Sequence, residues 1–414
     1  MKKIASKEIF IKIIILAVLI LMAVSGITGC RANRDVAGAS LKDTAAAEQQ
    51  IGSEGSGQAE EAAENTPGRN ENNSSNEAES KSQSNDVNGT SIGTESSNAS
   101  DSTIDENKIL FTFVISGDNR PANNENPQPE VFIKLLKYIK QQNPDFYINT
   151  GDIIMGNTEN ENVIKRQFTD YLDALKNLGT LSFVAPGNHD VANNMSGKYF
   201  LEWIQKPVLN NAGSIGIKAG AGLPGNELSG GDPQETANNE AQIENGSIKN
   251  SLYYYLEYKG VYFVVLDTYE KGYWGLVQTD QLFWLGQLLE KLKDKPVFVF
   301  LHPPVYSVMN PECITDGSLH VAFSSKENQD YIRSLFAGYK VDGVFCGHEH
   351  FYNKQEHDGV QYIITGCSGA SPYAPEDEGG FNHFLRMQIR AKSWTMDVID
   401  STGNKVYTEE ILFN

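Results

Sequence analysis

Five apolar, strand-like runs in this chain each end in a short polar cluster that contains glycine or proline. The clusters are Gly117-Asp118-Asn119-Arg120, Gly151-Asp152, Gly187-Asn188-His189-Asp190, His302-Pro303-Pro304 and Gly347-His348-Glu349-His350. Because helix-like stretches alternate with the runs, the pattern predicts an α/β fold in which right-handed crossovers join parallel strands. The carboxyl ends of such strands converge at one edge of a sheet, so the five clusters are expected to meet there.

Hydrophobic periodicity places the remaining elements along residues 108–414, which are expected to form one domain. Apolar residues at helical spacing predict helices at 131–141, 163–178, 280–292 and 326–336. Strands are predicted at 109–116, 146–148, 181–184, 253–258, 261–266, 297–301, 341–346, 362–365, 384–389, 394–399 and 406–411. A Gly/Asn-rich stretch at about 210–250 shows neither period, and we expect it to be an irregular insertion.

The first thirty residues resemble a bacterial lipoprotein signal. Lys2, Lys3 and Lys7 precede an apolar stretch at 13–24, which is followed by Ile27-Thr28-Gly29-Cys30. The resemblance implies that residues 1–29 are removed and that Cys30 carries the lipid (palmitate), which tethers the protein to the outer face of the cell membrane. An uncleaved anchor is the alternative, but an apolar run of about 12 residues is short of the ~20 needed to span a bilayer.

Residues 30–107 have the composition of a disordered linker, rich in Ser, Asn, Glu, Gly and Ala. Such a segment cannot bury enough apolar surface to offset the entropy lost on ordering. From Arg31 to Asn107 there are 15 acidic and 5 basic residues, a net charge of −10 out of −19 for the whole chain. This acidity argues against nucleic acid as a partner.

The side chains in the five clusters are of the types that divalent metals bind. They comprise two carboxylates, one amide oxygen and three imidazoles: Asp118, Asp152, Asn188, His302, His348 and His350. A mixed oxygen and nitrogen set suits Mn, Fe, Zn or Mg. A carboxylate shared by two such ions about 4 Å apart lets them stabilise the attacking and leaving oxygens of a displacement at phosphorus, with a metal-activated water as nucleophile. The sequence therefore predicts a two-metal phosphoesterase site.

The order of GD, GNHD and GHEH over about residues 109–390 resembles the calcineurin-like metallophosphoesterases, which include the purple acid phosphatases. The resemblance implies a four-layer α/β/β/α sandwich with two mixed β-sheets, and hydrolysis of phosphomonoesters or phosphodiesters. It also implies that Asp152 bridges two ions. Asn188, His302 and His348 would complete one ion's shell, and Asp118 and His350 would bind the other. His189 would protonate the leaving oxygen or stabilise phosphoryl charge, and Asp190 would orient or electrostatically support His189.

One position departs from the pattern of this family. Many members have Asp-x-His in the first motif, whereas this chain has Asp118-Asn119-Arg120. Arginine stays protonated and cannot bind a cation. Purple acid phosphatases use a tyrosine three residues after the second motif's aspartate, but Met155 stands there. The first ion is thus expected to be the weaker, and we hypothesise that Arg120 binds the substrate phosphate. The alternative is a structural arginine paired with an acidic neighbour.

Taken singly, most of these residues have an ordinary structural explanation. Asp and Asn after a strand often serve as turn residues or helix caps, and a lone His is as often a core residue as a ligand. Two other functions stay open for the whole chain. One is a non-catalytic lipoprotein that binds a phosphorylated ligand or a cell-wall polymer, and the other is a surface lipoprotein in which metals only brace the fold. His383 is a further residue that could approach the site.

Overall fold

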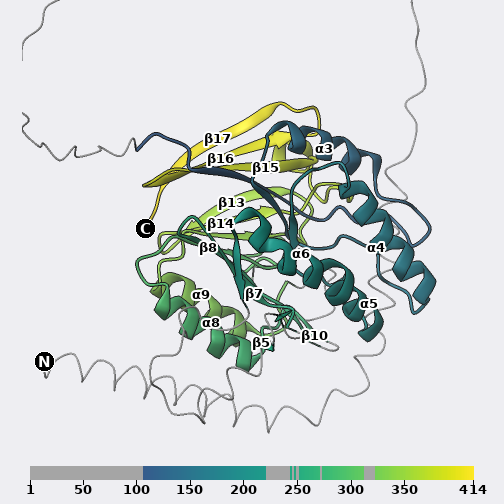
Figure 1. Cartoon of the computed structure of the whole chain (residues 1–414), viewed down its shortest axis with the longest axis horizontal. Helices are drawn as coiled ribbons and strands as arrows, with labels where there is room; N and C mark the ends of the chain where they lie inside the picture. Colours follow the sequence, from purple (N-terminus) through teal and green to yellow (C-terminus); the bar gives the residue numbers. More distant parts are fainter. Residues whose placement is uncertain (1–105, 221–242, 245–246, 249–250, 271–272, 312–321) are drawn as a thin grey trace, which may run out of the picture.

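The computed structural model describes residues 106–220, 243–244, 247–248, 251–270, 273–311 and 322–414. The signal segment, Cys30, the linker up to residue 105 and residues 221–242 of the insertion lie outside these ranges. In the part that is described, two β-sheets pack face to face and helices cover their outer sides (Figure 1). The predicted four-layer α/β/β/α sandwich with two mixed sheets is confirmed.

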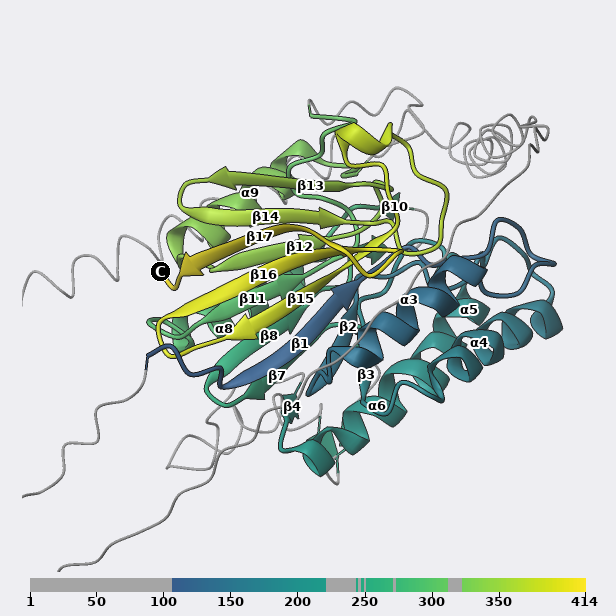
Figure 2. The same ribbon diagram turned by 90° about the horizontal axis from the view of Figure 1, so that it is seen from above.

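The first sheet has six strands in the order β17-β16-β15-β1-β2-β3. β1 (Phe111–Ser116), β2 (Phe146–Asn149) and β3 (Ser182–Val184) run parallel to one another. β15 (His383–Ile389), β16 (Ser393–Asp400) and β17 (Lys405–Leu412) extend it in antiparallel fashion from the other side of β1. Figure 2 shows this sheet spread in front of the second one.

The second sheet has seven strands in the order β13-β14-β12-β11-β8-β7-β4. Its parallel centre consists of β8 (Val261–Val265), β11 (Val297–Phe300), β12 (Gly343–Cys346) and β14 (Val360–Thr365). β13 (Tyr352–His357), β7 (Tyr254–Tyr258) and β4 (Lys218–Gly220) pair antiparallel at its two sides. Two small hairpins pair β9 (Tyr269–Glu270) with β10 (Tyr273–Trp274) and β5 (Ile243–Glu244) with β6 (Ser247–Ile248).

The long helices lie close to where the sequence predicts them. α3 (Glu130–Gln141) and α4 (Glu161–Leu175) cover the first sheet, and α8 (Thr279–Lys291) and α9 (Lys326–Gly338) cover the second. In α3 the apolar stripe is buried as expected, through Phe132, Leu135, Leu136 and Ile139. The Asn160 side chain caps α4 and that of Ser325 caps α9, because each accepts a hydrogen bond from a backbone N–H of the first turn.

Three apolar cores hold the four layers together. The core between the sheets is rich in phenylalanine, for example Phe113 stacked on Phe146 with ring centroids 5.2 Å apart and Phe263 edge-on to both. One further core lies between each sheet and its helices. Burial of both faces explains why the central strands read as continuous apolar runs rather than as alternating ones.

The structure differs from the sequence-based expectation in two regions. Residues 194–215 form a chain of short helices that the periodicity did not indicate: α5 (Asn194–Tyr199), the π-helix η1 (Phe200–Gln205), α6 (Lys206–Asn211) and the 3₁₀ helix η2 (Ala212–Ile215). The expected irregular insertion therefore begins as ordered structure, and β4 within it joins the second sheet. Strand β13 and the 3₁₀ turn η3 (Glu376–Glu378) were also not predicted. No helix among the described residues is long and apolar enough to cross a membrane.

Candidate metal centre

The five polar clusters meet where strands of both sheets end. Asp118 follows β1, Asp152 follows β2, and Asn188 lies in the loop after β3, all from the first sheet. His302 follows β11, and His348 and His350 follow β12 in the second sheet. Among the described residues, the ligand atoms of Asp118, Asp152 and His302 lie within 4.8 Å of one another, and all three side chains are buried. Side chains up to 184 positions apart in the sequence thus form one compact cluster.

The backbone at these loop positions is unusual. Asp118 and Asp152 both have a φ of 56°, and His348 has a φ of 70°, in the left-handed region that residues with a side chain rarely adopt. The loops after β2 and β3 also approach each other closely, since a Cβ on Gly187 would collide with the backbone and carboxylate of Asp152. Only glycine leaves room for that carboxylate to lie against the loop after β3.

Three histidines are oriented by backbone carbonyl groups. The Nδ1 of His302 lies 2.9 Å from Thr150 O, that of His350 lies 2.9 Å from Ser371 O, and that of His189 lies 2.6 Å from Met155 O. Because a carbonyl oxygen only accepts, each Nδ1 carries the proton and donates it. In the neutral ring, Nε2 then keeps its lone pair, in the tautomer that a metal ligand requires, and in the protonated ring the same Nε2 carries a proton that it can donate.

The Nε2 atoms of these histidines point toward the two aspartates. His302 Nε2 lies 3.4 Å from Asp152 Oδ1, and His350 Nε2 lies 3.4 Å from Asp118 Oδ1. His189 Nε2 lies 3.9 Å from the other oxygen of Asp152. The backbone N–H of His348 donates to the Asp118 carboxylate, with 3.1 Å to each oxygen.

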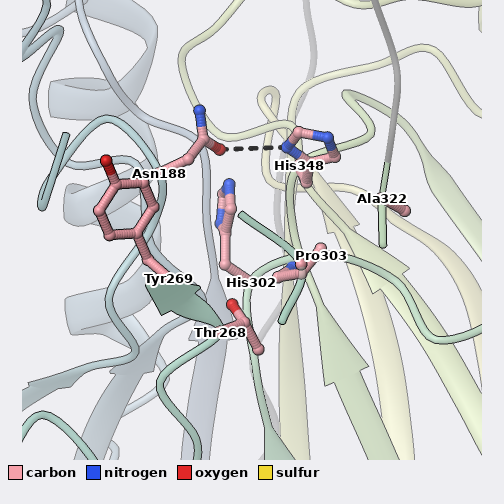
Figure 3. A pocket seen from close by; sticks show the side chains of 8 residues that line it. Asn188, Thr268, Tyr269, His302, Pro303, Ala322 and His348 are labelled. Atoms are coloured by element: carbon pink, nitrogen blue, oxygen red, sulfur yellow. Dashed lines mark hydrogen bonds between the residues drawn. The ribbon is translucent and has the colours of Figure 1, made fainter. Parts of the chain in front are cut away.

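Asn188 and His348 come together at the mouth of the site. His348 Nδ1 donates to Asn188 Oδ1 across 3.2 Å, and Figure 3 shows this contact beside the His302 ring. A pocket opens there, lined by Asn188, Thr268, Tyr269, Gly275, His302, Pro303, Ala322 and His348. Thr268, just before β9, and Tyr269, the first residue of β9, thus contribute to the wall of the site, which the sequence did not indicate.

The electrostatics centre on Asp152. Burial alone would raise the pKa of Asp152, but the neighbouring His302, His189 and Arg120 hold it well below its ordinary value. For His302, burial lowers the pKa, but the Asp152 and Asp118 carboxylates outweigh it and raise the pKa to about 9. The site therefore strongly favours an ionised carboxylate beside a positive charge.

Asp190 has different contacts from those expected. Its carboxylate accepts hydrogen bonds from the backbone N–H groups of Asp152 at 2.8 Å, Ile153 at 2.9 Å, Ile154 at 3.3 Å and Gly187 at 2.9 Å. Burial, and then the nearby Asp152 charge, raise the pKa of Asp190. The hydrogen bonds of the Asp190 carboxylate fix the Asp152 loop, and Met155 O accepts a hydrogen bond from the His189 ring. That Asp190 orients or electrostatically supports His189 stays a prediction.

Arg120 is buried against the same aspartate. Its side chain is 8% exposed, its Nε lies 3.7 Å from Asp152 Oδ2, and its Nη1 donates to Met155 Sδ at 3.3 Å. These contacts match the alternative of an arginine paired with an acidic neighbour. That neighbour is itself a predicted metal ligand, so the pairing lies inside the site.

Several residues that shape the centre carry no signal in the sequence. Thr150 and Ser371 act through backbone carbonyls, and the Tyr373 ring stacks on the His350 ring with centroids 3.9 Å apart. Glu349 faces away from the centre, because its carboxylate binds the loop after β11. His383, the further candidate, is a core residue whose ring nitrogens bond to Thr365 Oγ1 and Phe381 O.

The arrangement at Asp118, Asp152 and His302 suits a divalent ion. His302 Nε2 is buried and has no hydrogen-bond partner among the described residues, although it lies beside a carboxylate. Two carboxylates and an imidazole whose Nε2 faces inward form a donor set that Mn, Fe, Zn and Mg accept once the ring is neutral.

Residues 111–352 match the family model described as "Calcineurin-like phosphoesterase". This match covers more than half of the chain and includes all five polar clusters. The chain belongs to the calcineurin-like phosphoesterase family. Membership in this family implies divalent metal ions, as the resemblance of the motifs predicted.

Individual relatives of this calcineurin-like phosphoesterase are distant. The chain is 25% identical over 155 residues to tartrate-resistant acid phosphatase type 5 of Mus musculus, covering 32% of this chain and 42% of that protein. It is 29% identical over 118 residues to the phosphoenolpyruvate phosphatase of Allium cepa, covering 28% of this chain and 22% of that protein. The chain thus spans less than half the length of either relative. A solved dimetal phosphatase of Danio rerio superposes with a TM-score of 0.48 at 14% identity, covering 74% of this chain and 100% of the other.

Proposed function

We propose that this calcineurin-like phosphoesterase hydrolyses phosphomonoesters or phosphodiesters in a metal-dependent reaction. The observation that carries the proposal is the buried group of Asp118, Asp152 and His302, whose ligand atoms lie within 4.8 Å of one another with His189 beside it. The family match and the phosphatases among the relatives support the same reaction class.

A divalent ion at this centre would lower the pKa of a water and neutralise charge on the phosphoryl group. The protein's own part is to hold the ligands rigidly. Backbone carbonyls fix the imidazole tautomers, and Asp190 fixes the loop that carries Asp152. His189 is held through Nδ1, so its Nε2 edge faces the centre, where it can transfer a proton to a leaving oxygen.

The proposed metal is Mn, Fe, Zn or Mg, because the mixed donor set accepts each of these ions. The proposed location is the outer face of the cell membrane, with the protein attached through a lipid on Cys30. The support for this location is the sequence alone: a positive flank, an apolar segment and Ile27-Thr28-Gly29-Cys30. In cells, a Cys30→Ala variant should lose labelling by a radioactive or clickable palmitate analogue and leave the membrane fraction. Full labelling of that variant would contradict the lipid-anchor proposal.

The reaction is tested with aryl phosphate substrates and one variant. The purified chain should hydrolyse para-nitrophenyl phosphate or its bis-ester, lose this activity on chelation and regain it with one of the four metals. His189→Ala should lower kcat by roughly 10²–10⁴-fold because the proton donor is removed, while the metal content stays at the wild-type level. His357→Ala is the matched control, since that half-buried histidine packs against Tyr306 and makes no contact with the predicted ligands among its described interactions.

Three results would overturn the proposed reaction. They are turnover that survives complete metal removal, a His189→Ala variant as active as the wild type, and tight binding of phosphate esters with no turnover under any metal. The last result would favour the non-catalytic phosphoryl-binding function instead.

A further inference from the structure

The two oxygens of the Asp152 carboxylate have different surroundings. Oδ1 lies 3.4 Å from His302 Nε2 and accepts the backbone N–H of His189 at 3.0 Å. Oδ2 lies 3.7 Å from Arg120 Nε and 3.9 Å from His189 Nε2. Oδ1 therefore faces the metal-ligand group, whereas Oδ2 faces a guanidinium and the predicted proton donor.

Arg120 is a permanent charge at a fixed position. Arg120 is 7% exposed and lies two positions after Asp118 in the sequence. Its Nη1 donates a hydrogen bond to Met155 Sδ. A guanidinium stays protonated at any pH at which proteins fold, and it has no lone pair with which to bind a metal. A second divalent cation on the Oδ2 side of Asp152 would have to lie close to this charge and share the same oxygen with it.

The ligands themselves also form one group rather than two. Among the described residues, Asp118, Asp152 and His302 are the ones whose ligand atoms all lie within 4.8 Å of one another. His350 Nε2 lies 3.4 Å from Asp118 Oδ1, but among the described residues His350 does not belong to a group of three with all ligand atoms within 4.8 Å of one another. The residues expected to hold the first ion are thus less well gathered than those around His302.

We propose that the centre holds a single tightly bound divalent ion among Asp118, Asp152 and His302, and that the Arg120 guanidinium replaces a second ion at Asp152 Oδ2. This inference rests on the proposed function, in that it assigns the number of ions at the same site. It replaces the two-ion centre expected from the sequence with one ion and one fixed organic cation. A guanidinium also binds phosphoryl groups, so the hypothesis that Arg120 binds the substrate phosphate is compatible with this inference.

Metal stoichiometry tests the proposal without recourse to activity. The full chain, stripped of metal, is titrated with Mn²⁺ by calorimetry, and the loaded protein is examined by electron paramagnetic resonance. The wild type should bind one tight equivalent and give the six-line spectrum of an isolated Mn²⁺. Arg120→His removes the charge and adds a ligand, so it should bind two equivalents with the exchange-coupled spectrum of ions about 4 Å apart.

Arg386→His is the matched control. Arg386 is also ion-paired with a buried aspartate, with its Nη2 2.6 Å from Asp397 Oδ2, but it lies in strand β15 and not in the loops that carry the predicted ligands. The Arg386→His variant should retain one equivalent. Two tight, coupled ions in the wild type would overturn the inference and leave the proposed hydrolase intact, and so would a folded Arg120→His variant that binds one. If the wild type bound no ion tightly, both the single-ion inference and the proposed metal-dependent hydrolysis would be overturned. The wild-type result decides the matter even if the variant does not fold.

Discussion

Three of the predicted metal ligands hold a backbone conformation that residues with a side chain rarely adopt. Asp118, Asp152 and His348 all have positive φ, and such positions cost about 1–3 kcal/mol each unless the surroundings compensate. The compensation is visible at Asp152, whose loop is held by the Asp190 carboxylate through three of its N–H groups. Strain and its support thus coincide with residues that are predicted to bind metal.

Gly187→Ala tests how much the centre depends on close backbone approach. The added Cβ would overlap Asp152 Oδ1 and the Asp152 backbone, so the carboxylate has to move. We expect Mn²⁺ affinity to fall about 10–100-fold, the range typical of disturbed ligand support. Gly338→Ala is the control, because a Cβ there meets nothing within 4 Å, and its Mn²⁺ affinity should equal that of the wild type. Equal affinities in the two variants, measured by calorimetry, would contradict the close-approach argument.

Among individual residues, the sequence indicated the predicted ligands but not the groups that hold them in place. All six predicted ligands lie in loops at the same end of the two sheets, because a strand-end position can be recognised from the apolar run before it. The carbonyls of Thr150 and Ser371 and the ring of Tyr373 could not be recognised. Their contribution depends on which backbone group or face a tertiary contact presents, and residue type does not encode that.

Among the elements, the sequence predicted those that bury a face with a regular period and missed those without such a period. Helices α3, α8 and α9 agree with prediction to within two residues because each buries a regular apolar stripe. Strand β13 was missed because it lies at a sheet edge and reads YNKQEH, with no buried face to create alternation. The helices at 194–215 are too short, and change from α to π to 3₁₀ too often, to show one period.

The loops after β11 and β12 are tied together by one buried carboxylate. Glu349 accepts hydrogen bonds from the Ser307 hydroxyl, from Val308 N at 3.0 Å and from Met309 N at 3.3 Å. It lies between His348 and His350 in the chain, and the loop it binds also carries His302. Glu349 therefore fixes the distance between the two loops of the second sheet that carry predicted ligands.

Glu349→Gln should weaken both the fold and the centre. The amide keeps the shape but loses the charge that strengthens these hydrogen bonds, so we expect the free energy of unfolding to fall by about 1–3 kcal/mol. Mn²⁺ affinity should fall with it. Urea unfolding and calorimetry measure the two effects. Glu356→Gln, at the exposed position of the edge strand β13, is the comparison and should change neither quantity. A Glu349→Gln variant with wild-type metal affinity would exclude the proposed tie.

For the whole molecule, the centre exists only when the two sheets are packed together. Asp118, Asp152 and Asn188 come from the first sheet, and the histidines of the second sheet complete the set. The phenylalanine-rich core between the sheets sets their separation, so core packing and ligand geometry are coupled. A change that loosens this core is therefore expected to lower metal affinity as well as stability, even where it lies far from any ligand.

The pH dependence of the whole fold should report on His383. This residue is fully buried, and burial lowers its pKa to about 4, against about 6.5 in an unfolded chain. Between these two values the unfolded chain binds the proton more readily than the folded protein. The contribution of His383 to the free energy of unfolding is thus fully present above pH 6.5. It is lost as the pH falls toward 4, by about 3 kcal/mol in all.

His383→Gln removes this titration while retaining a polar group of similar reach near Thr365 and Phe381. The variant should be less stable than the wild type at pH 7.5, because packing and hydrogen bonds are disturbed. Its stability should, however, decline less steeply between pH 6.5 and 4.5, so that the two unfolding curves converge on acidification. Urea unfolding of metal-free protein at several pH values measures this, with the half-buried His357→Gln as a control that keeps nearly the wild-type slope. Parallel slopes for the wild type and His383→Gln would show that the acid sensitivity arises elsewhere, for instance in the carboxylates of the centre.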